Sequence, residues 1–306
     1  MGHSVKRTPT EPDFCYAKAV DRLRVVTLNI WNRLGPWDDR KHLIRQGMER
    51  WRPDLMGLQE VLRLRTGSGA LDQASELAEG LSYEVAYAEG HEVGSGLSFG
   101  NALLSRYPIL AQARHELPGA EATGHARSVL HAVVDAPCGK VHVFVTHLSY
   151  RLHEGSVRLE QARFIADLVR AEVPVRGGDY PPILMGDLNA EPDSDEIRYL
   201  TGLATVGGQS VYFADVWRYC GSDPGHTFDP RNAYAAEVHE PARRIDYILV
   251  RGPDMKRRGK PLEARVIYDE PEDGVWPSDH FGVMAELSVG SVSFAPAGTD
   301  PSGGTS

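Results

Sequence analysis

The chain has 306 residues, of which 42% are hydrophobic and 25% charged, and its formal net charge is −9. This composition supplies enough apolar material for a large core, and the length admits one large domain or two smaller ones. The negative charge gives no overall attraction to nucleic acid, which disfavours tight unspecific duplex binding. The 3 cysteines form no CxxC pair, which argues against a disulfide framework or a structural zinc site.

The two ends of the chain differ in composition from the middle. Residues 1–20 and 291–306 are rich in Gly, Ser, Pro and Thr, and we expect a disordered arm and a disordered tail around a single domain over residues 21–290. No apolar run approaches ~20 residues, so we expect no transmembrane association. The N-terminus lacks the apolar core of a secretory signal. We therefore expect a cytoplasmic protein, and we infer no obligate protein partner.

Along the domain, short strand-like runs outnumber helical ones. The first clear helix is expected over Arg40–Trp51, with Asp38 or Asp39 as its cap. Further helices are expected over residues 70–80, after Ser156 and after Ser194. The expected strands are Arg24–Ile30, Asn101–Ser105, Ser128–Val134, Val141–Leu148, Pro182–Asp187, Arg244–Val250, Ala264–Tyr268 and Phe281–Leu287. This pattern favours an α/β or α+β fold with sheets packed face to face and helices outside.

Polar side chains recur where the expected strands end. These residues are Asn29, Glu60, His147, Asp187, Asn189, Asp279 and His280. Each one alone is most simply a turn or packing residue. Their recurrence at several strand ends favours a functional site, because sites are assembled on loops at one edge of a sheet. Within the strand Arg244–Val250, Asp246 shares a face with Ile248 and Val250, so its carboxylate requires a partner.

The set of side chains at the strand ends is chemically coherent. It offers carboxylate and amide oxygens together with two imidazoles. Mg²⁺ prefers oxygen ligands and keeps several waters, so one or two carboxylates and an amide are enough to hold it. The pattern therefore predicts a site for Mg²⁺, with Mn²⁺ as a possible substitute.

Seven motifs occur in an order that resembles the endonuclease/exonuclease/phosphatase superfamily. They are "TLNIW", "LMGLQEV", "LLSRYPI", "VTHL", "LMGDLNAEP", "RIDYILV" and "PSDHFGV", spread over about Leu23 to Leu287. The resemblance implies a four-layer αββα sandwich, in which two packed mixed β-sheets are flanked by helices. It also implies a metal-dependent hydrolase of phosphoric esters, with its site where the strand ends converge.

The same resemblance implies a role for each motif residue. Glu60 is similar to the principal metal ligand, with Asn29 and Asp279 near the metal or the scissile phosphate. Asp187 resembles the group that activates the attacking water, and Asn189 positions the water or the phosphate. His280, held by Asp246, resembles the imidazole that contacts a phosphoryl oxygen, and His147 resembles a second imidazole near the phosphate. At Trp31 the chain departs from abasic-site endonucleases, which carry an acidic residue there.

Four further residues are candidates for substrate binding. A guanidinium fork suits phosphate oxygens, which nominates Arg106 and Arg127. Trp276 could stack on a base or touch lipid, and His226 could contact the leaving group from a long loop over residues 219–244. Each has an equally simple structural interpretation. "GLSFG" at residues 96–100 fits the serine-hydrolase elbow but lacks the strand before it and the helix after it, so we expect a loop near the site.

The sequence thus favours an Mg²⁺-dependent phosphodiesterase or phosphatase. A nucleotide, a nucleic-acid end or a small phosphorylated metabolite fits the acidic chain best. Two alternatives stay open: a sphingomyelinase-like phospholipid phosphodiesterase, and a non-catalytic protein that binds phosphate ligands on the same scaffold.

Overall fold

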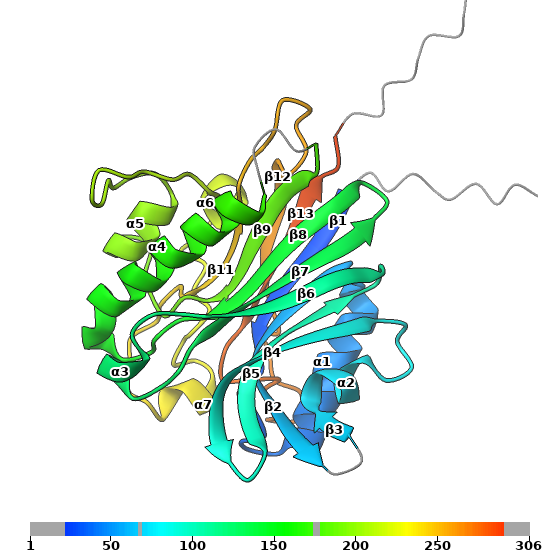
Figure 1. The fold of residues 1–306 in the computed structure, drawn as a ribbon. Helices are drawn as coiled ribbons and strands as arrows, with labels where there is room; N and C mark the ends of the chain where they lie inside the picture. The colour runs from blue at the N-terminus through cyan, green and yellow to red at the C-terminus, as the bar shows by residue number, and fades with distance from the viewer. Residues whose placement is uncertain (1–21, 67–68, 174–177, 291–306) are drawn as a thin grey trace, which may run out of the picture.

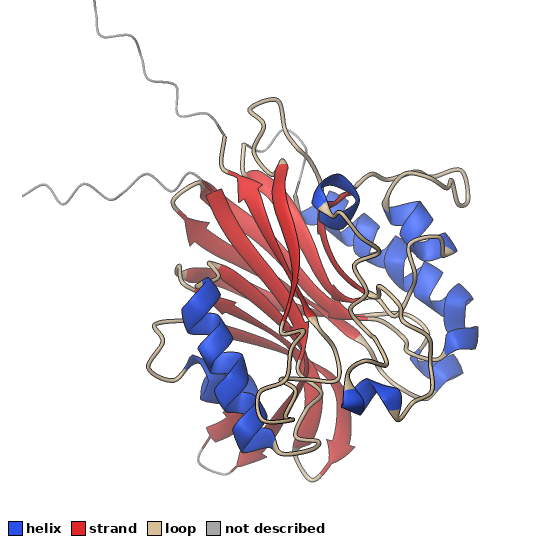
Figure 2. Ribbon diagram, turned by 180° about the vertical axis from the view of Figure 1, so that it is seen from behind, coloured by secondary structure: helices blue, strands red, loops and turns tan. Residues whose placement is uncertain are grey.

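The computed structural model describes residues 22–66, 69–173 and 178–290. Two β-sheets pack face to face in the centre, and helices cover the outer face of each one (Figures 1 and 2). The expected αββα sandwich is therefore confirmed. The segments expected to be disordered, residues 1–20 and 291–306, lie outside the described residues.

The first sheet is mixed and is built around the N-terminal strand. In spatial order its strands are β12 (Pro261–Ile267), β13 (Gly282–Ser288), β1 (Arg22–Asn29), β2 (Leu55–Thr66), β5 (Leu97–Ser105) and β4 (Glu84–Gly94), with β3 (Gly69–Asp72) paired to β2. Strands β1 and β2 run parallel, with Asn29 beside Gln59. The carboxyl end of β1 therefore lies beside Gln59 in the middle of β2, which continues to Thr66.

The second sheet repeats this arrangement. In spatial order its strands are β10 (Ala214–Asp215), β11 (Asp246–Val250), β9 (Tyr180–Asp187), β8 (Gly139–His147), β7 (Ser128–Ala136) and β6 (Ile109–Glu116). Strands β8 and β9 run parallel and bring His147 beside Asp187. Strand β11 is antiparallel to β9 and sets Asp246 opposite Asp187. Three of the predicted site residues are thus neighbours by register alone.

The helices divide between the two outer faces. They are α1 (Trp37–Trp51), α2 (Gln73–Ala78), α3 (Ala120–Thr123), the 3₁₀ helix Leu152–Glu154, α4 (Gly155–Glu172), α5 (Asp195–Leu200), α6 (Val216–Cys220) and α7 (Ala233–Ala236). Helices α1 and α2 bury their apolar faces against the first sheet, and α4 and α5 against the second. None of the described helices is long and apolar enough to cross a membrane.

Several local predictions were wrong for identifiable reasons. Helix α1 begins after Pro36 without a side-chain cap, so neither Asp38 nor Asp39 caps it. The expected helix over residues 70–80 is split into β3 and α2, because Asp72 accepts a hydrogen bond from the Ser75 N–H and starts the helix there. Residues 96–100 fall almost wholly within strand β5, so the expected loop there is wrong. Strands β4 and β6 were missed because few of their residues are buried and they lack a clean apolar alternation.

The alternation of side chains carries polar groups into the gap between the sheets. In β9, Ile183 and Met185 belong to the apolar core between the sheets, and Asp187 continues their face with period two. In β11, Asp246 continues the face of Ile248 and Val250 in the same way. The inter-sheet core therefore ends in a layer of polar side chains, and this layer forms the floor of the site.

Close packing also restricts the backbone next to this layer. Gly186 has φ of 144°, and a Cβ atom there would lie 1.9 Å from the carbonyl oxygen of Thr146 on the neighbouring strand. Only glycine tolerates that approach. The glycine before Asp187 thus allows β8 and β9 to pair up to their ends.

Candidate active site

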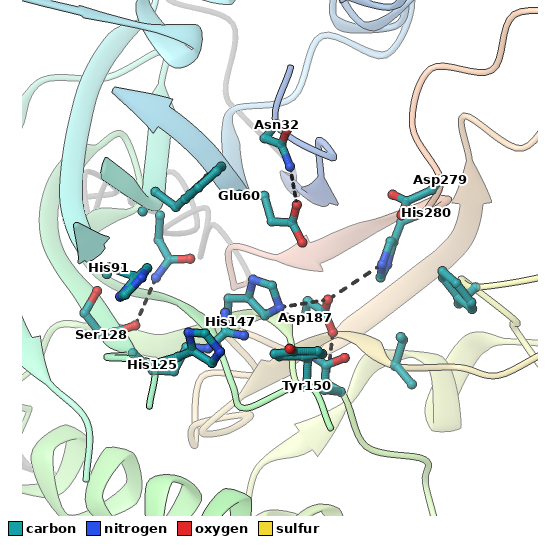
Figure 3. Close-up of a pocket in the computed structure, with 18 of the residues that line it drawn as sticks. Asn32, Glu60, His91, His125, Ser128, His147, Tyr150, Asp187, Asp279 and His280 are labelled. Carbon is teal, nitrogen blue, oxygen red and sulfur yellow. Dashed lines mark hydrogen bonds and ion pairs between the residues drawn. The ribbon is translucent and has the colours of Figure 1, made fainter. Parts of the chain in front are cut away.

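Asp187 lies at the centre of the polar layer (Figure 3). Its Oδ2 atom accepts a hydrogen bond from the Asn29 amide at 3.1 Å and lies 3.4 Å from Nε2 of His147 and 3.8 Å from Nε2 of His280. Its Oδ1 atom accepts from the backbone N–H of Asn189 at 2.9 Å. The carboxylate is almost completely buried, so these neighbours fix its orientation.

His280 and Asp246 form a buried pair beside it. Nδ1 of His280 lies 2.9 Å from Oδ2 of Asp246, so the carboxylate orients the ring and leaves Nε2 facing Asp187. The backbone N–H of Asp246 donates to the Thr227 hydroxyl, and the Thr227 carbonyl accepts from the N–H of Phe281. One residue of the 219–244 segment thus ties both partners of the pair together.

Glu60, which lies inside β2 and not at its end, and Asn189, which follows β9, have unusual backbone angles. Glu60 has φ of 57° and Asn189 has φ of 51°. Such left-handed conformations cost a non-glycine residue roughly 1–2 kcal/mol and are often found at functional sites. At Glu60 the pairing of β2 with β5 is interrupted by a register shift between Leu58 and Val61. The shift turns the Glu60 side chain into the cavity.

A second group of polar side chains lies beside Asp187 and consists of Glu60, Asn29 and Asn32. The Glu60 carboxylate accepts a hydrogen bond from the Asn29 amide at 3.2 Å and from the Asn32 amide at 3.0 Å. Asp279 lines the same cavity, and its carboxylate accepts from the Ser278 hydroxyl at 3.2 Å. In the part of the chain that the structure describes, Glu60, Asp187 and Asp279 have no lysine or arginine ion-pair partner. These oxygens suit a hard divalent cation, which would supply the missing positive charge.

The charges in the centre shift its titration. Burial, together with the charge of Asp246, raises the pKa of Asp187 to about 7. Burial and the charge of Glu60 raise the pKa of Asp279 to about 6, although His280 opposes the shift. Burial disfavours the charged ring of His280, but Asp246, Asp279 and Asp187 outweigh it and hold the pKa of His280 well above its usual value. A positive His280 thus lies among carboxylates.

His147 has the opposite environment. Burial and the positive charges of Arg127 and His280 lower its pKa well below the usual value. Its ring is therefore neutral near pH 7. The two imidazoles that face Asp187 thus differ in charge.

We expect the Asp187→Asn variant to be more stable than the natural chain at pH 8 in chelator, by roughly 1–3 kcal/mol. The pKa of Asp187 is raised on folding from 3.8 to about 7, so its contribution to stability is lost as the pH rises through 7. Asparagine does not ionise, so the variant does not lose this stability as the pH rises. Urea unfolding at pH 8 and pH 5 measures the difference, which should shrink at pH 5. An equal difference at both pH values would contradict this account.

A second set of groups could also hold a metal ion. One ligand atom from each of Asp187, Asp246 and His280 lies within 4.8 Å of the others, and all three residues are buried. However, both ring nitrogens of His280 already face carboxylates in this set. The oxygen-rich group around Glu60 is therefore the better match to Mg²⁺.

A cavity of about 510 Å³ opens above these residues. Arg127 lines it, as the sequence suggested. The other three substrate-binding candidates lie elsewhere: Arg106 faces Asp54 at the opposite end of β2, Trp276 is buried against Phe281, and His226 lines a separate cavity. The structure therefore does not bring Arg106, Trp276 or His226 to the site. Arg106 lies far from it because this residue follows the end of β5 that pairs with Leu55.

Several residues that shape the cavity are not among the predicted site residues, although three of them belong to the long loop over residues 219–244, from which we expected a contact to the leaving group. Tyr150 and Phe228 line it, and the Phe228 ring meets His280 edge-on at 5.1 Å. Val238 and Arg243 of the 219–244 segment form part of its wall. Asn32 could have been suspected only from its position three residues after Asn29. These residues become neighbours through loops whose paths no local pattern predicts.

Comparison with known proteins agrees with this geometry. Residues 26–280 match the Endonuclease/Exonuclease/phosphatase family. A putative neutral sphingomyelinase of Caenorhabditis elegans is 26% identical over 318 residues, covering 89% of this chain and 68% of that protein. A family member from Beutenbergia cavernae is 28% identical with a TM-score of 0.64, covering 88% of this chain and 72% of the other. D. rerio TDP2, complexed with a single-strand DNA product, is 21% identical with a TM-score of 0.69, covering 87% and 99%.

The chain belongs to the endonuclease/exonuclease/phosphatase family, because the family match spans most of its length. Members of this family hydrolyse phosphoric ester bonds with the help of a divalent metal. The chain is thus a hydrolase of phosphoric esters, as the sequence predicted. Which ester it cleaves, and with which metal, is a separate question.

Proposed function

We propose that this protein is an Mg²⁺-dependent phosphodiesterase whose general base is Asp187. The observation that carries the proposal is the position of Asp187, which is buried between a neutral and a positive imidazole and has a pKa near 7. A carboxylate with this pKa is a better proton acceptor near neutral pH than an ordinary aspartate.

In the proposed reaction, Asp187 takes a proton from water while the water oxygen forms a bond to phosphorus. The bond between phosphorus and the leaving oxygen breaks. His280 donates a hydrogen bond to a non-bridging oxygen, with Asp246 holding its ring, and Asn189 and His147 orient the phosphate. These donors act where charge develops, which is the strongest contribution a protein makes to such a step.

Glu60, Asn29 and Asp279 are the proposed ligands of the cation, with Asn32 holding the Glu60 carboxylate in place. When bound, Mg²⁺ or Mn²⁺ would polarise the phosphate and stabilise the negative charge of the leaving oxygen. Arg127 is the proposed partner of a phosphate oxygen. The preferred substrate classes are a nucleotide, a nucleic-acid end or a small phosphorylated metabolite, consistent with the net charge of −9.

A hydrolysis screen tests this function. The substrates are bis(4-nitrophenyl) phosphate, 4-nitrophenyl phosphate, single-stranded DNA and sphingomyelin, each with Mg²⁺, with Mn²⁺ and with chelator. We expect cation-dependent release from a diester. Inertness on every substrate with either cation would support a non-catalytic phosphate-binding protein instead. Cleavage of sphingomyelin alone would support the sphingomyelinase-like alternative.

Metal binding can be tested apart from turnover. Mg²⁺ at about 100 times its Kd should stabilise the protein by roughly 2.7 kcal/mol. We expect Glu60→Gln to abolish this stabilisation, because it removes the charged ligand, and His280→Gln to retain most of it. Thermal unfolding with increasing Mg²⁺ measures both. The reverse pattern would assign the metal to the buried group of Asp187, Asp246 and His280.

A further inference from the structure

A cluster of four basic side chains lies beside the catalytic centre, and three of the four take no part in the proposed reaction. It consists of His91 from β4, His125 and Arg127 from the segment before β7, and Arg151 just after β8. Figure 3 shows His91 and His125 across the pocket from Asp279 and His280, with His147 and Asp187 between them. His91, His125 and Arg127 line the same cavity as the catalytic residues.

The members of this cluster contact one another closely. The rings of His91 and His125 meet edge-on at 5.4 Å, and Nη2 of Arg151 lies 3.5 Å from Nε2 of His125. The guanidinium groups of Arg127 and Arg151 lie 5.7 and 5.5 Å from the centre of the same ring, that of Tyr150. Two permanent positive charges and two imidazoles are thus gathered around one exposed aromatic ring.

Few negative groups balance these charges. Arg151 pairs with Glu154 at 3.2 Å, but over the described ranges Arg127 forms no ion pair. Glu60 and Asp187 act on Arg127 only as more distant charges. Burial and the positive charges of His91, Arg151 and Arg127 lower the pKa of His125. Such an accumulation of donors in a protein with net charge −9 favours an anion.

We propose that His91, His125, Arg127 and Arg151 bind a second phosphate of a small substrate whose first phosphate is the one that is hydrolysed. This inference rests on the proposed function, since it takes the scissile phosphate to lie at Asp187. It narrows the substrate class to a small phosphodiester that carries a second, terminal phosphate, such as a phosphorylated dinucleotide. A ligand with only one phosphate leaves the cluster unpaired.

Binding to the Asp187→Asn variant tests the subsite without requiring turnover. The probes are thymidine 3′,5′-bisphosphate and thymidine 5′-phosphate, titrated calorimetrically with Mg²⁺ present. We expect the bisphosphate to bind about tenfold more tightly. Adding His91→Gln, or His125→Gln with Arg151→Gln, should reduce that preference to about twofold or less and leave the affinity for the monophosphate unchanged. Within the described part of the chain the His91 side chain forms no hydrogen bond, so the single change should not disturb folding.

The control is Arg106→Gln, which removes a positive charge at the opposite end of β2 and should keep the preference. Equal affinity for the two nucleotides, or a preference that survives both cluster variants, would overturn the proposal. Affinity that keeps rising as further nucleotides are added would identify a nucleic-acid strand and overturn the small-substrate assignment. Because no outcome depends on hydrolysis, failure of the proposed function and failure of this subsite are distinguishable.

Discussion

Replacing Asp187 by asparagine should lower the rate of cation-dependent hydrolysis by a factor of about 10³ or more. The amide is nearly the same size, and its single oxygen can still accept the hydrogen bond from either Asn29 or Asn189, but it cannot accept the proton of the attacking water. Its loss also removes the negative charge that His147 and His280 both face. Steady-state rates on the best diester from the screen, with Mg²⁺ in excess, measure the effect.

The matched control is Asp195→Asn, which makes the same chemical change on the exposed first turn of α5. It should leave the rate unchanged. Asp187→Asn should still be stabilised by Mg²⁺, because the proposed ligands are intact. A variant that keeps a tenth or more of the natural rate would show that another group activates the water, and Asp187 would then only orient its neighbours.

The strand pattern predicted packed sheets with helices outside, and the resemblance to the family supplied the four-layer αββα order. Strands β1, β8, β9, β11 and β13 are buried on one or both faces, and each was expected within a few residues of its observed bounds. Strands β4 and β6 lie at sheet edges and have few buried side chains, so their patterning is weak. The cap expected for α1 was wrong because the helix begins after Pro36 and uses no side-chain cap.

The site was predictable to the extent that strand register determines it. His147, Asp187 and Asp246 are placed by the pairing of three neighbouring strands, and the ordered motifs already indicated that these strand ends converge. The substrate-binding prediction at Arg106 relied on residue type, and the one at His226 on residue type and the length of its loop. A guanidinium or an imidazole in a loop has no periodicity to show which end of a sheet it reaches.

One buried residue that the sequence did not single out holds the two halves of the centre together. Arg40 of α1 is fully buried and packs against the rings of Trp31 and Trp37. Its guanidinium donates to five backbone carbonyls, those of Ile30, Trp31, Asn32, Leu34 and Pro277. The first four belong to residues that follow Asn29, the last residue of β1. The fifth belongs to Pro277, which precedes Asp279. Arg40 thus connects the loop that carries one proposed metal ligand to the loop that carries another.

We expect Arg40→Met to lower the free energy of unfolding by about 3–5 kcal/mol. Methionine fills much of the volume, but it leaves the five carbonyls without their buried donor. The loops that carry Asn29 and Asp279 should then separate, which weakens Mg²⁺ binding and hydrolysis together. Urea unfolding, Mg²⁺-dependent thermal stabilisation and the diesterase rate measure the three effects.

Arg45→Met is the matched control, because Arg45 lies on the same helix and donates to three carbonyls, those of Glu76, Leu77 and Glu79, at the end of α2. Its loss should cost less stability, since Arg45 is partly exposed, and should leave Mg²⁺ binding unchanged. Arg40→Lys keeps the positive charge but has three donors instead of five, so it should lie between the natural chain and Arg40→Met. If Arg40→Met is as destabilised as expected but binds Mg²⁺ and turns over substrate normally, Arg40 supports the fold without positioning the centre. If Arg40→Met and Arg45→Met weaken Mg²⁺ binding equally, the effect belongs to helix α1 as a whole.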